Sequence, residues 1–170
     1  PWADGGGSCV MPGLVYTHGD MKEPRRREWE GFETGTPAAA AGGGTTILDM
    51  PLNSIPATTT VAALEAKRDA ARGKGVVNVE FIGGVVPGNA GDLEALRGAG
   101  VRAFKCFLSP SGVDEFPAVS ERDLREAFPV LARLGLPLMV HAEDPALLLP
   151  GRGSSRKYGD YLMTRPVAAE

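Results

Sequence analysis

Short apolar runs alternate with helix-forming segments along the whole of this 170-residue chain. Each run is rich in β-branched or other large apolar residues and is followed by turn residues, which is the pattern of a β-strand. We predict five strands, at residues 14–18, 45–51, 76–86, 101–108 and 136–143. Strands this apolar, separated by helical segments, form a parallel sheet that is covered on both faces. The alternation therefore predicts an α/β fold.

The segments between the strands carry helix formers, caps and stop signals. We predict helices at residues 28–41, 58–72, 92–99 and 120–134, and a further helix that begins at Tyr158 and is cut off by the end of the chain. The threonines at residues 58–60 are suitable caps for the second helix, and Gly135 is a suitable stop for the fourth.

Two architectures fit this order of elements, an open doubly wound sheet and a (β/α)8 barrel. A nucleotide-binding doubly wound sheet carries a glycine-rich turn after its first strand, and residues 17–24 contain no such turn. Polar residues instead follow the ends of the strands, where barrel enzymes carry their chemistry. A complete barrel has eight strands and about 250 residues. We therefore predict an incomplete (β/α)8 barrel with about five β/α units in residues 13–170, after a lead-in at residues 1–12.

Composition narrows the possible partners and the compartment. The net charge is −3, and the one basic cluster, at residues 25–27, is read as a solvated loop, so no nucleic-acid partner is expected. No window approaches the roughly 20 apolar residues of a membrane span, and no signal sequence is recognisable. Two cysteines do not make a disulfide scaffold. We expect a cytoplasmic protein without a membrane partner, whose natural N-terminus is missing because the chain opens with Pro1.

Three of the predicted strands carry a side chain that could bind a metal ion. His18 ends the first strand and Asp20 follows two residues on, a spacing that places both on one side of a strand. His141 lies at the end of another apolar run, and Lys105 lies in the middle of a third. A buried lysine is unfavourable unless it is paired with a charge, neutral or modified. As alternatives, His18 can be a structural histidine, and Lys105 can extend between helices toward solvent.

Four segments carry a resemblance to a known family. They read Glu-Trp-Glu-Gly-Phe-Glu-Thr-Gly-Thr at residues 28–36, Asp-Met-Pro-Leu-Asn-Ser-Ile-Pro at 49–56, Phe-Lys-Cys-Phe at 104–107 and His-Ala-Glu-Asp-Pro at 141–145. With them the chain resembles the cyclic amidohydrolases from about residue 10 to residue 170, and within that family the allantoinases. The segment at residues 49–56 favours allantoinase over dihydroorotase and hydantoinase, which remain alternatives within the family.

The resemblance implies a (β/α)8 barrel of the metal-dependent hydrolase type, with two divalent metal ions, usually Zn²⁺, at the C-terminal ends of its strands. It further implies that His18, His141 and a carboxylated, bridging Lys105 bind these ions. Asn53 and Ser54 lie in the loop implied to line the substrate pocket, although Asn53 is equally explained as a turn residue bonded to its own backbone. A metal-activated hydroxide would open the ring amide of a cyclic ureide, allantoin, to give allantoate in purine catabolism. The family also implies a homotetrameric parent protein.

The chain departs from the family pattern at its first strand. The family reads Asp-Thr-His-x-His, and here the corresponding residues are Tyr16, Thr17, His18, Gly19 and Asp20. Asp20 thus replaces the second histidine ligand; aspartate can bind zinc, but it is shorter and adds negative charge. Strand alternation would place bulky Tyr16 on the same side as His18, near the implied metal ions.

The resemblance also implies parts that these 170 residues lack. The family's later ligands, including its catalytic aspartate, have no counterpart here, and residues 1–12 would be only a remnant of its N-terminal β-sandwich. We predict that the chain alone does not turn over substrate. Two hypotheses follow: a segment of an allantoinase-like hydrolase whose activity belongs to a longer parent, or a metal-free remnant that acts at most in self-association.

Overall fold

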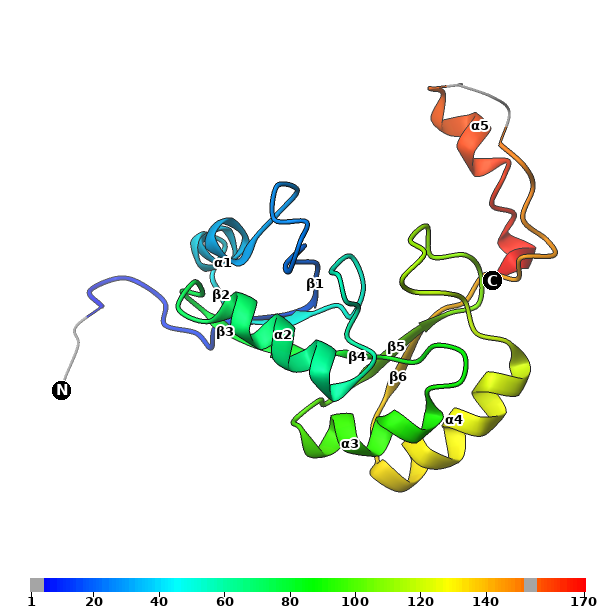
Figure 1. The fold of residues 1–170 in the computed structure, drawn as a ribbon. Helices are drawn as coiled ribbons and strands as arrows, with labels where there is room; N and C mark the ends of the chain where they lie inside the picture. Colours follow the sequence, from blue (N-terminus) through cyan, green and yellow to red (C-terminus); the bar gives the residue numbers. More distant parts are fainter. Residues whose placement is uncertain (1–4, 152–155) are drawn as a thin grey trace.

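The chain is built on parallel strands that are connected through helices. The structure, a computed structural model, describes residues 5–151 and 156–170. Its strands are β1 (Leu14–Gly19), β2 (Gly44–Asp49), β3 (Asn78–Phe81), β4 (Gly83–Gly84), β5 (Phe104–Phe107) and β6 (Leu138–His141). They form two three-stranded sheets, in the orders β1–β2–β3 and β4–β5–β6, and every neighbouring pair is parallel (Figure 1). The predicted α/β fold with parallel strands is confirmed.

The two sheets are joined through the segment predicted as a single strand at residues 76–86. Ile82 separates β3 from β4, and its N–H still donates to the carbonyl of Asp49 at the end of β2, at 3.0 Å. The next N–H, that of Gly83, donates instead to the carbonyl of Ala103 before β5, also at 3.0 Å. This segment therefore pairs with β2 through its first half and with β5 through its second, so that the strands form one open, staggered arc.

The helices follow the predicted order, and two of them have the predicted caps. They are α1 (Phe32–Ala41), α2 (Val61–Ala71), α3 (Leu93–Gly98), α4 (Glu121–Leu134) and α5 (Tyr158–Leu162), with short 3₁₀ turns at Ala90–Asp92 and Val167–Ala169. The hydroxyl of Thr60 accepts from the N–H of Ala63 at the start of α2, and Ser120 forms a capping box with Asp123 at the start of α4. Gly135 ends α4 with a φ of 65°, a conformation that favours glycine.

Two helix boundaries differ from the prediction. Helix α1 begins at Phe32 rather than at Glu28, because the preceding residues are held in a turn by the hydrogen bond from the N–H of Trp29 to the carbonyl of Arg26 (3.0 Å). Helix α5 ends at Leu162, within the chain, and not at the chain terminus. In both places local turn geometry overrides helix-forming composition.

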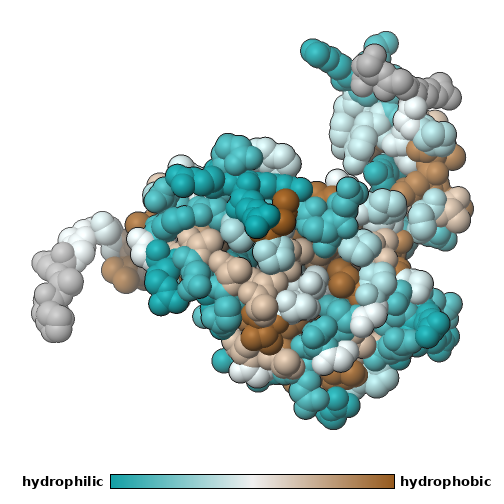
Figure 2. Space-filling view, in the orientation of Figure 1, coloured by the Kyte–Doolittle hydropathy of each residue, from teal (hydrophilic) through white to brown (hydrophobic). Residues whose placement is uncertain are grey.

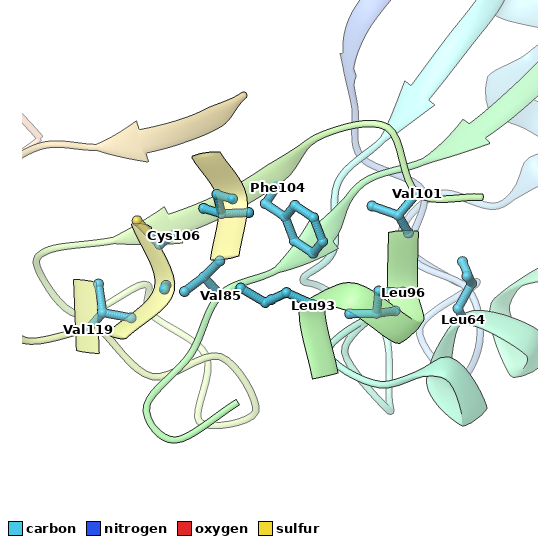
Figure 3. Packing of buried hydrophobic residues seen from close by; sticks show 10 residues of the cluster. Leu64, Val85, Leu93, Leu96, Val101, Phe104, Cys106 and Val119 are labelled. Carbon is cyan, nitrogen blue, oxygen red and sulfur yellow. The ribbon is translucent and has the colours of Figure 1, made fainter. Parts of the chain in front are cut away.

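The outer face of the arc packs against α2, α3 and α4. Phe104 and Cys106 point outward from β5 into this layer, where Leu93 and Leu96 of α3 are fully buried (Figure 3). The other buried members of this cluster are Leu64, Val85, Val101, Val119, Ala127 and Leu131. Because residues alternate along a strand, Lys105 must lie on the opposite, inner face.

The inner face is covered by loops that follow the strands. Met50, Ile82 and Ala103 form a buried cluster there with Leu52, Ala57 and Phe116, which come from the β2–α2 and β5–α4 loops. Gly84 allows the close approach of one loop, since a Cβ atom at this position would lie 2.4 Å from a ring carbon of Phe116. The inner face is thus closed by loop residues over part of its area.

A buried ion pair joins β2 to α2. The carboxylate of Asp49 lies 2.7 Å from the ammonium of Lys67, and both side chains are fully buried. Lys67 also donates to the carbonyl of Met50 at 2.6 Å, and Asp49 accepts from the N–H of Met21 at 2.7 Å. Burial raises the pKa of the Asp49 carboxyl above its ordinary value, while the Lys67 ammonium and the Met21 N–H oppose this shift.

The residues after β6 form an arm that projects away from the strands and helices (Figure 1). The arm is held by hydrogen bonds between Asp144 N–H and the carbonyl of Ala169 (2.7 Å) and between Leu149 N–H and the carbonyl of Thr164 (3.1 Å). Its exposed apolar surface is visible in Figure 2 and includes Leu147, Leu149, Tyr158, Tyr161, Leu162, Met163 and Val167. None of the helices in the described residues is long and apolar enough to cross a membrane.

We predict that Lys67→Met lowers the free energy of unfolding by about 3–5 kcal/mol, because it leaves the Asp49 carboxylate buried without its cation. Urea denaturation followed by circular dichroism measures this loss. The folded-state pKa of Asp49 is raised, so the folded protein gains stability relative to the unfolded chain as the pH falls through that pKa. The loss caused by Lys67→Met is therefore expected to shrink at low pH.

Arg72→Met provides the matched control. Arg72 pairs with Asp69 at 2.7 Å, but both side chains are largely exposed, so the expected change in stability is small. Equal losses in the two variants would contradict a special role for the buried pair.

Candidate functional site

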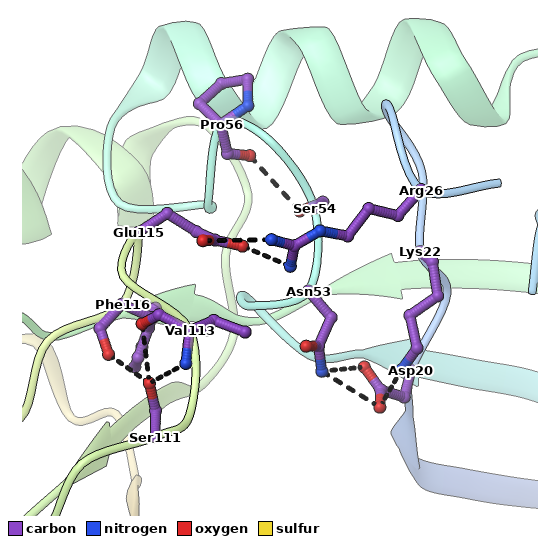
Figure 4. Close-up of polar contacts among 10 residues, drawn as sticks. All are labelled: Asp20, Lys22, Arg26, Asn53, Ser54, Pro56, Ser111, Val113, Glu115 and Phe116. Carbon is purple, nitrogen blue, oxygen red and sulfur yellow. Dashed lines mark hydrogen bonds and ion pairs between the residues drawn. The ribbon is translucent and has the colours of Figure 1, made fainter. Parts of the chain in front are cut away.

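The candidate residues lie at the C-terminal ends of the strands, where the β1–α1, β2–α2 and β5–α4 loops meet (Figure 4). Asp20 belongs to the first of these loops and Asn53 to the second, while His141 is the last residue of β6. Lys105 lies in β5, directly beside Met139 of β6 in the parallel register. The order of the strands therefore brings residues that are far apart in sequence to the same end of the arc.

Lys105 is a buried amine without an anionic partner. Its side chain is 7% exposed, and its ammonium lies 4.9 Å from the centre of the Phe107 ring. Among the described residues no carboxylate lies within ion-pair distance of it. Burial lowers the pKa of Lys105, which increases the fraction of neutral, nucleophilic amine. Burial also raises the pKa of the adjacent Cys106 thiol to about 11, so this thiol is not a reactive thiolate at neutral pH.

His141 and Lys105 both contact the ring of Phe107. Its ring stacks on Phe107 with the ring centres 4.9 Å apart and an interplanar angle of 20°. Its Nε2 lies 2.8 Å from a carboxylate oxygen of Glu143, and the same oxygen accepts from Arg165, also at 2.8 Å. The hydrogen bond with His141 is the main cause that lowers the pKa of Glu143. Glu143 thus orients His141.

A bulge changes the expected geometry of β1. Thr17 and His18 stand opposite the single residue Leu48 of β2, because the pairing passes from Tyr16–Ile47 directly to Gly19–Asp49. The bulge interrupts the alternation that would place Tyr16 on the same side as His18. Tyr16 instead lines a pocket of about 570 Å³ between β1 and α1, and His18 is exposed.

Asp20 and Asn53 form a second polar group. The Nδ2 of Asn53 donates to the two carboxylate oxygens of Asp20, at 3.0 and 3.3 Å, and Asp20 also forms an ion pair with Lys22 (Figure 4). Asn53 has a φ of 63°, which asparagine tolerates better than most residues. Ser54 is buried, and its hydroxyl donates to the carbonyl of Pro56 at 3.3 Å. The side chain of Asn53 therefore reaches another loop, although its backbone is turn-like.

These residues meet the requirements of a metal site only in part. Imidazole nitrogens from His18 and His141 are suitable zinc ligands, and a carboxylated Lys105 would be a suitable oxygen ligand. Asp20 is engaged by Lys22 and Asn53, so it would have to exchange these contacts to bind a metal ion. Within residues 5–151 and 156–170, no group of three or more His, Cys, Asp or Glu side chains is arranged to hold a metal ion.

One contact at this site was missed by the sequence reasoning. Arg26 belongs to the cluster predicted to be a solvated loop, yet its guanidinium pairs with Glu115 at 2.5 Å, and the two side chains are only 20% and 19% exposed. The partners are 89 residues apart. A local charge pattern contains no signal for such a pair, and only the prediction that the loops after β1 and β5 meet could have suggested it.

Comparisons with known proteins show which sequences the chain is similar to. No protein-family model matches the chain. The allantoinase of Streptomyces avermitilis is 52% identical over 169 residues, which are 98% of this chain and 38% of that protein. The allantoinase of Saccharomyces cerevisiae is 47% identical over 164 residues, which are 95% of this chain and 36% of that protein.

A solved structure is also similar to the chain. The L-hydantoinase (dihydropyrimidinase) of Arthrobacter aurescens superimposes with a TM-score of 0.85 at 30% identity, over 94% of this chain and 36% of that protein. Parallel strands with polar side chains at their C-terminal ends, together with these relatives, place the chain in the cyclic amidohydrolase family. Within that family its sequence is most similar to that of allantoinases among the relatives named here, and it spans little more than a third of the length of the relatives it matches.

We predict that Arg25→Gly raises the free energy of unfolding by about 1 kcal/mol, because Arg25 has a φ of 79° and a left-handed conformation is unfavourable for residues other than glycine. The midpoint of urea denaturation measures the change. Arg27→Gly is the control, since Arg27 lies in the same loop but not in the left-handed region. A gain in both variants would show that loss of positive charge, and not relief of backbone strain, stabilises the loop.

Proposed function

We propose that this chain forms the N-terminal part of an allantoinase, which hydrolyses the ring amide of allantoin to give allantoate. The observation that carries the proposal is Lys105, a buried amine with a lowered pKa and no carboxylate partner, on the inner face of a parallel strand. Such a lysine is unfavourable as a purely structural residue. The high identity to allantoinases over nearly the whole chain supports allantoin as the substrate rather than a hydantoin or dihydroorotate.

The proposal includes a complete (β/α)8 barrel in the parent protein. The staggered parallel arc, with outer helices and polar groups at the strand ends, supports this architecture. In this arrangement residues 13–170 form the N-terminal part of the barrel, and residues 1–12 lead into it. Strands from the remainder of the parent would pair with the open edges at β1 and β6.

Zinc is the cofactor that the family implies, with two ions per site. His18, His141 and a carboxylated Lys105 are the residues of this chain that would hold it. Bound metal supplies an activated water and polarises the amide carbonyl. The chain's own contribution is to keep the Lys105 amine neutral enough to react with carbon dioxide, because burial lowers its pKa, and to orient the His141 ring through Glu143.

Asn53 and Ser54 are proposed to line the substrate pocket. The amide of Asn53 can exchange its hydrogen bond with Asp20 for one with a ureide, whose N–H and C=O groups match an amide. The buried hydroxyl of Ser54 holds the loop through Pro56. Asp20, fixed by Lys22, acts here as the support for Asn53 and not as a metal ligand.

We further propose a cytoplasmic, homotetrameric parent enzyme that uses neither a nucleic-acid nor a membrane partner. The 170 residues alone are proposed to be inactive, because they supply only part of the ligand set. A second hypothesis is a metal-free remnant that acts in self-association. The engagement of Asp20 by Lys22 and Asn53 favours it, since a metal ion would have to compete with both contacts for this carboxylate.

The test joins this chain to the C-terminal remainder of the Streptomyces avermitilis relative, in bicarbonate buffer with added zinc. We expect about two zinc ions per chain, as in a two-metal site, and hydrolysis of allantoin. Lys105→Gln is expected to lose zinc and at least about a thousandfold in rate, because the metal provides several kcal/mol of transition-state stabilisation.

Arg125→Gln is the control, because Arg125 pairs with Glu121 on the exposed surface of α4. It should retain both zinc and activity. Zinc uptake by Asp20→His but not by the parent chimaera would instead support the second hypothesis. Hydrolysis that Lys105→Gln leaves unchanged would refute the proposed role of Lys105.

A further inference from the structure

An ion pair between two loops crosses the C-terminal end of the arc (Figure 4). Arg26 in the β1–α1 loop meets both carboxylate oxygens of Glu115 in the β5–α4 loop, with nitrogen–oxygen distances of 2.5 and 3.4 Å. Trp29 lies beside the pair, since the guanidinium of Arg26 is 5.2 Å from the centre of its ring. A paired, largely buried guanidinium with an aromatic neighbour is better fixed than an exposed ion pair.

Glu115 is directly attached to the residue that covers the inner face. Phe116, the next residue, is fully buried, and its ring meets Phe107 edge to face with the centres 5.9 Å apart. The hydroxyl of Ser111 donates to the carbonyl of Phe116 at 2.5 Å and closes the loop on itself. The ion pair that holds Glu115 therefore also restrains the adjacent Phe116.

Phe107 links the β5–α4 loop to Lys105. The ammonium of Lys105 lies 4.9 Å from the centre of the Phe107 ring, and the Phe116 ring meets Phe107 edge to face. Lys105 is only 7% exposed, although the arc is open at both edges. Lys105 is therefore connected to the β5–α4 loop through Phe107 and Phe116.

The other end of the ion pair is fixed independently. The loop that carries Arg26 is closed by a hydrogen bond from Lys22 N–H to the carbonyl of Glu30, at 2.8 Å. It is tied to the β2–α2 loop by a hydrogen bond from Ile55 N–H to the carbonyl of Pro24, at 3.1 Å. Arg26 thus projects from an anchored loop.

We propose that the Arg26–Glu115 ion pair is a latch, which holds the β5–α4 loop over the inner face and controls access of small molecules to Lys105. The latch goes beyond the proposed hydrolase activity and does not require it. When the pair opens, the segment that carries Phe116 can move away from Phe107, and the Lys105 amine is then reached from the C-terminal end of the strands.

The experiment measures access to Lys105 directly in the 170-residue chain. Reductive methylation with formaldehyde and cyanoborohydride, followed by peptide mass spectrometry, gives a labelling rate for each lysine. In Glu115→Gln the expected rate at Lys105 is about fivefold higher, because loss of one ion pair raises the population of the open loop by about this factor. Arg26→Gln should give the same increase from the other side of the pair.

Two internal controls separate opening of the loop from unfolding. Lys67 is fully buried against the outer face and should stay protected in every variant. Glu121→Gln removes an equivalent charge from an exposed pair with Arg125 and should leave the labelling of Lys105 unchanged.

An increase at Lys105 in both latch variants, with Lys67 protected and no effect of Glu121→Gln, supports the latch. Unchanged labelling of Lys105 in both latch variants overturns it. A parallel rise at Lys67 and Lys105 overturns it as well, because the ion pair would then support the whole sheet and not the loop alone.

Discussion

The buried ion pair of Asp49 and Lys67 is the interaction on which the arrangement of the site depends. It lies at the end of β2, where Asp49 also binds the N–H of Met21 and Lys67 also binds the carbonyl of Met50. One pair thereby fixes Met21 near the start of the β1–α1 loop and Met50 at the start of the β2–α2 loop. The Asp20–Asn53 contact joins residues close to these two points, since Asp20 immediately precedes Met21 and Asn53 lies three residues after Met50. A charge pair on the outer face thus sets polar geometry at the strand ends.

The two faces of the arc have different tasks. Helices cover the outer face with mainly apolar side chains, and Phe104 and Cys106 are completely buried beneath them. The inner face carries Lys105 and, at its end, His141, and loop residues such as Phe116 cover it. A layer of packed helices resists change, whereas loops held by a few polar contacts can open. Alternation along β5 therefore places the core residues Phe104 and Cys106 on one face and the candidate site residue Lys105 on the other.

Much of the fold follows from local sequence signals, and part of the site does not. The parallel strands, the cap at Ser120 and the stop at Gly135 follow from periodicity and turn chemistry, which act over a few residues. The placement of Lys105 and His141 on adjacent strands follows from strand order. The bulge at His18 and the pairing of Arg26 with Glu115 depend on contacts between distant segments, which no local pattern encodes.

The change of partners at Ile82 has a geometric consequence. The residues before Ile82 pair with β2, and the residues after it pair with β5. Neighbouring strands are therefore shifted relative to one another along the strand direction. A parallel sheet with such a displacement tilts its strands and curls, as the strands of a closed barrel do. The hydrogen-bond register within residues 78–107 thus already contains the strand shift that would curve the proposed barrel, without further strands.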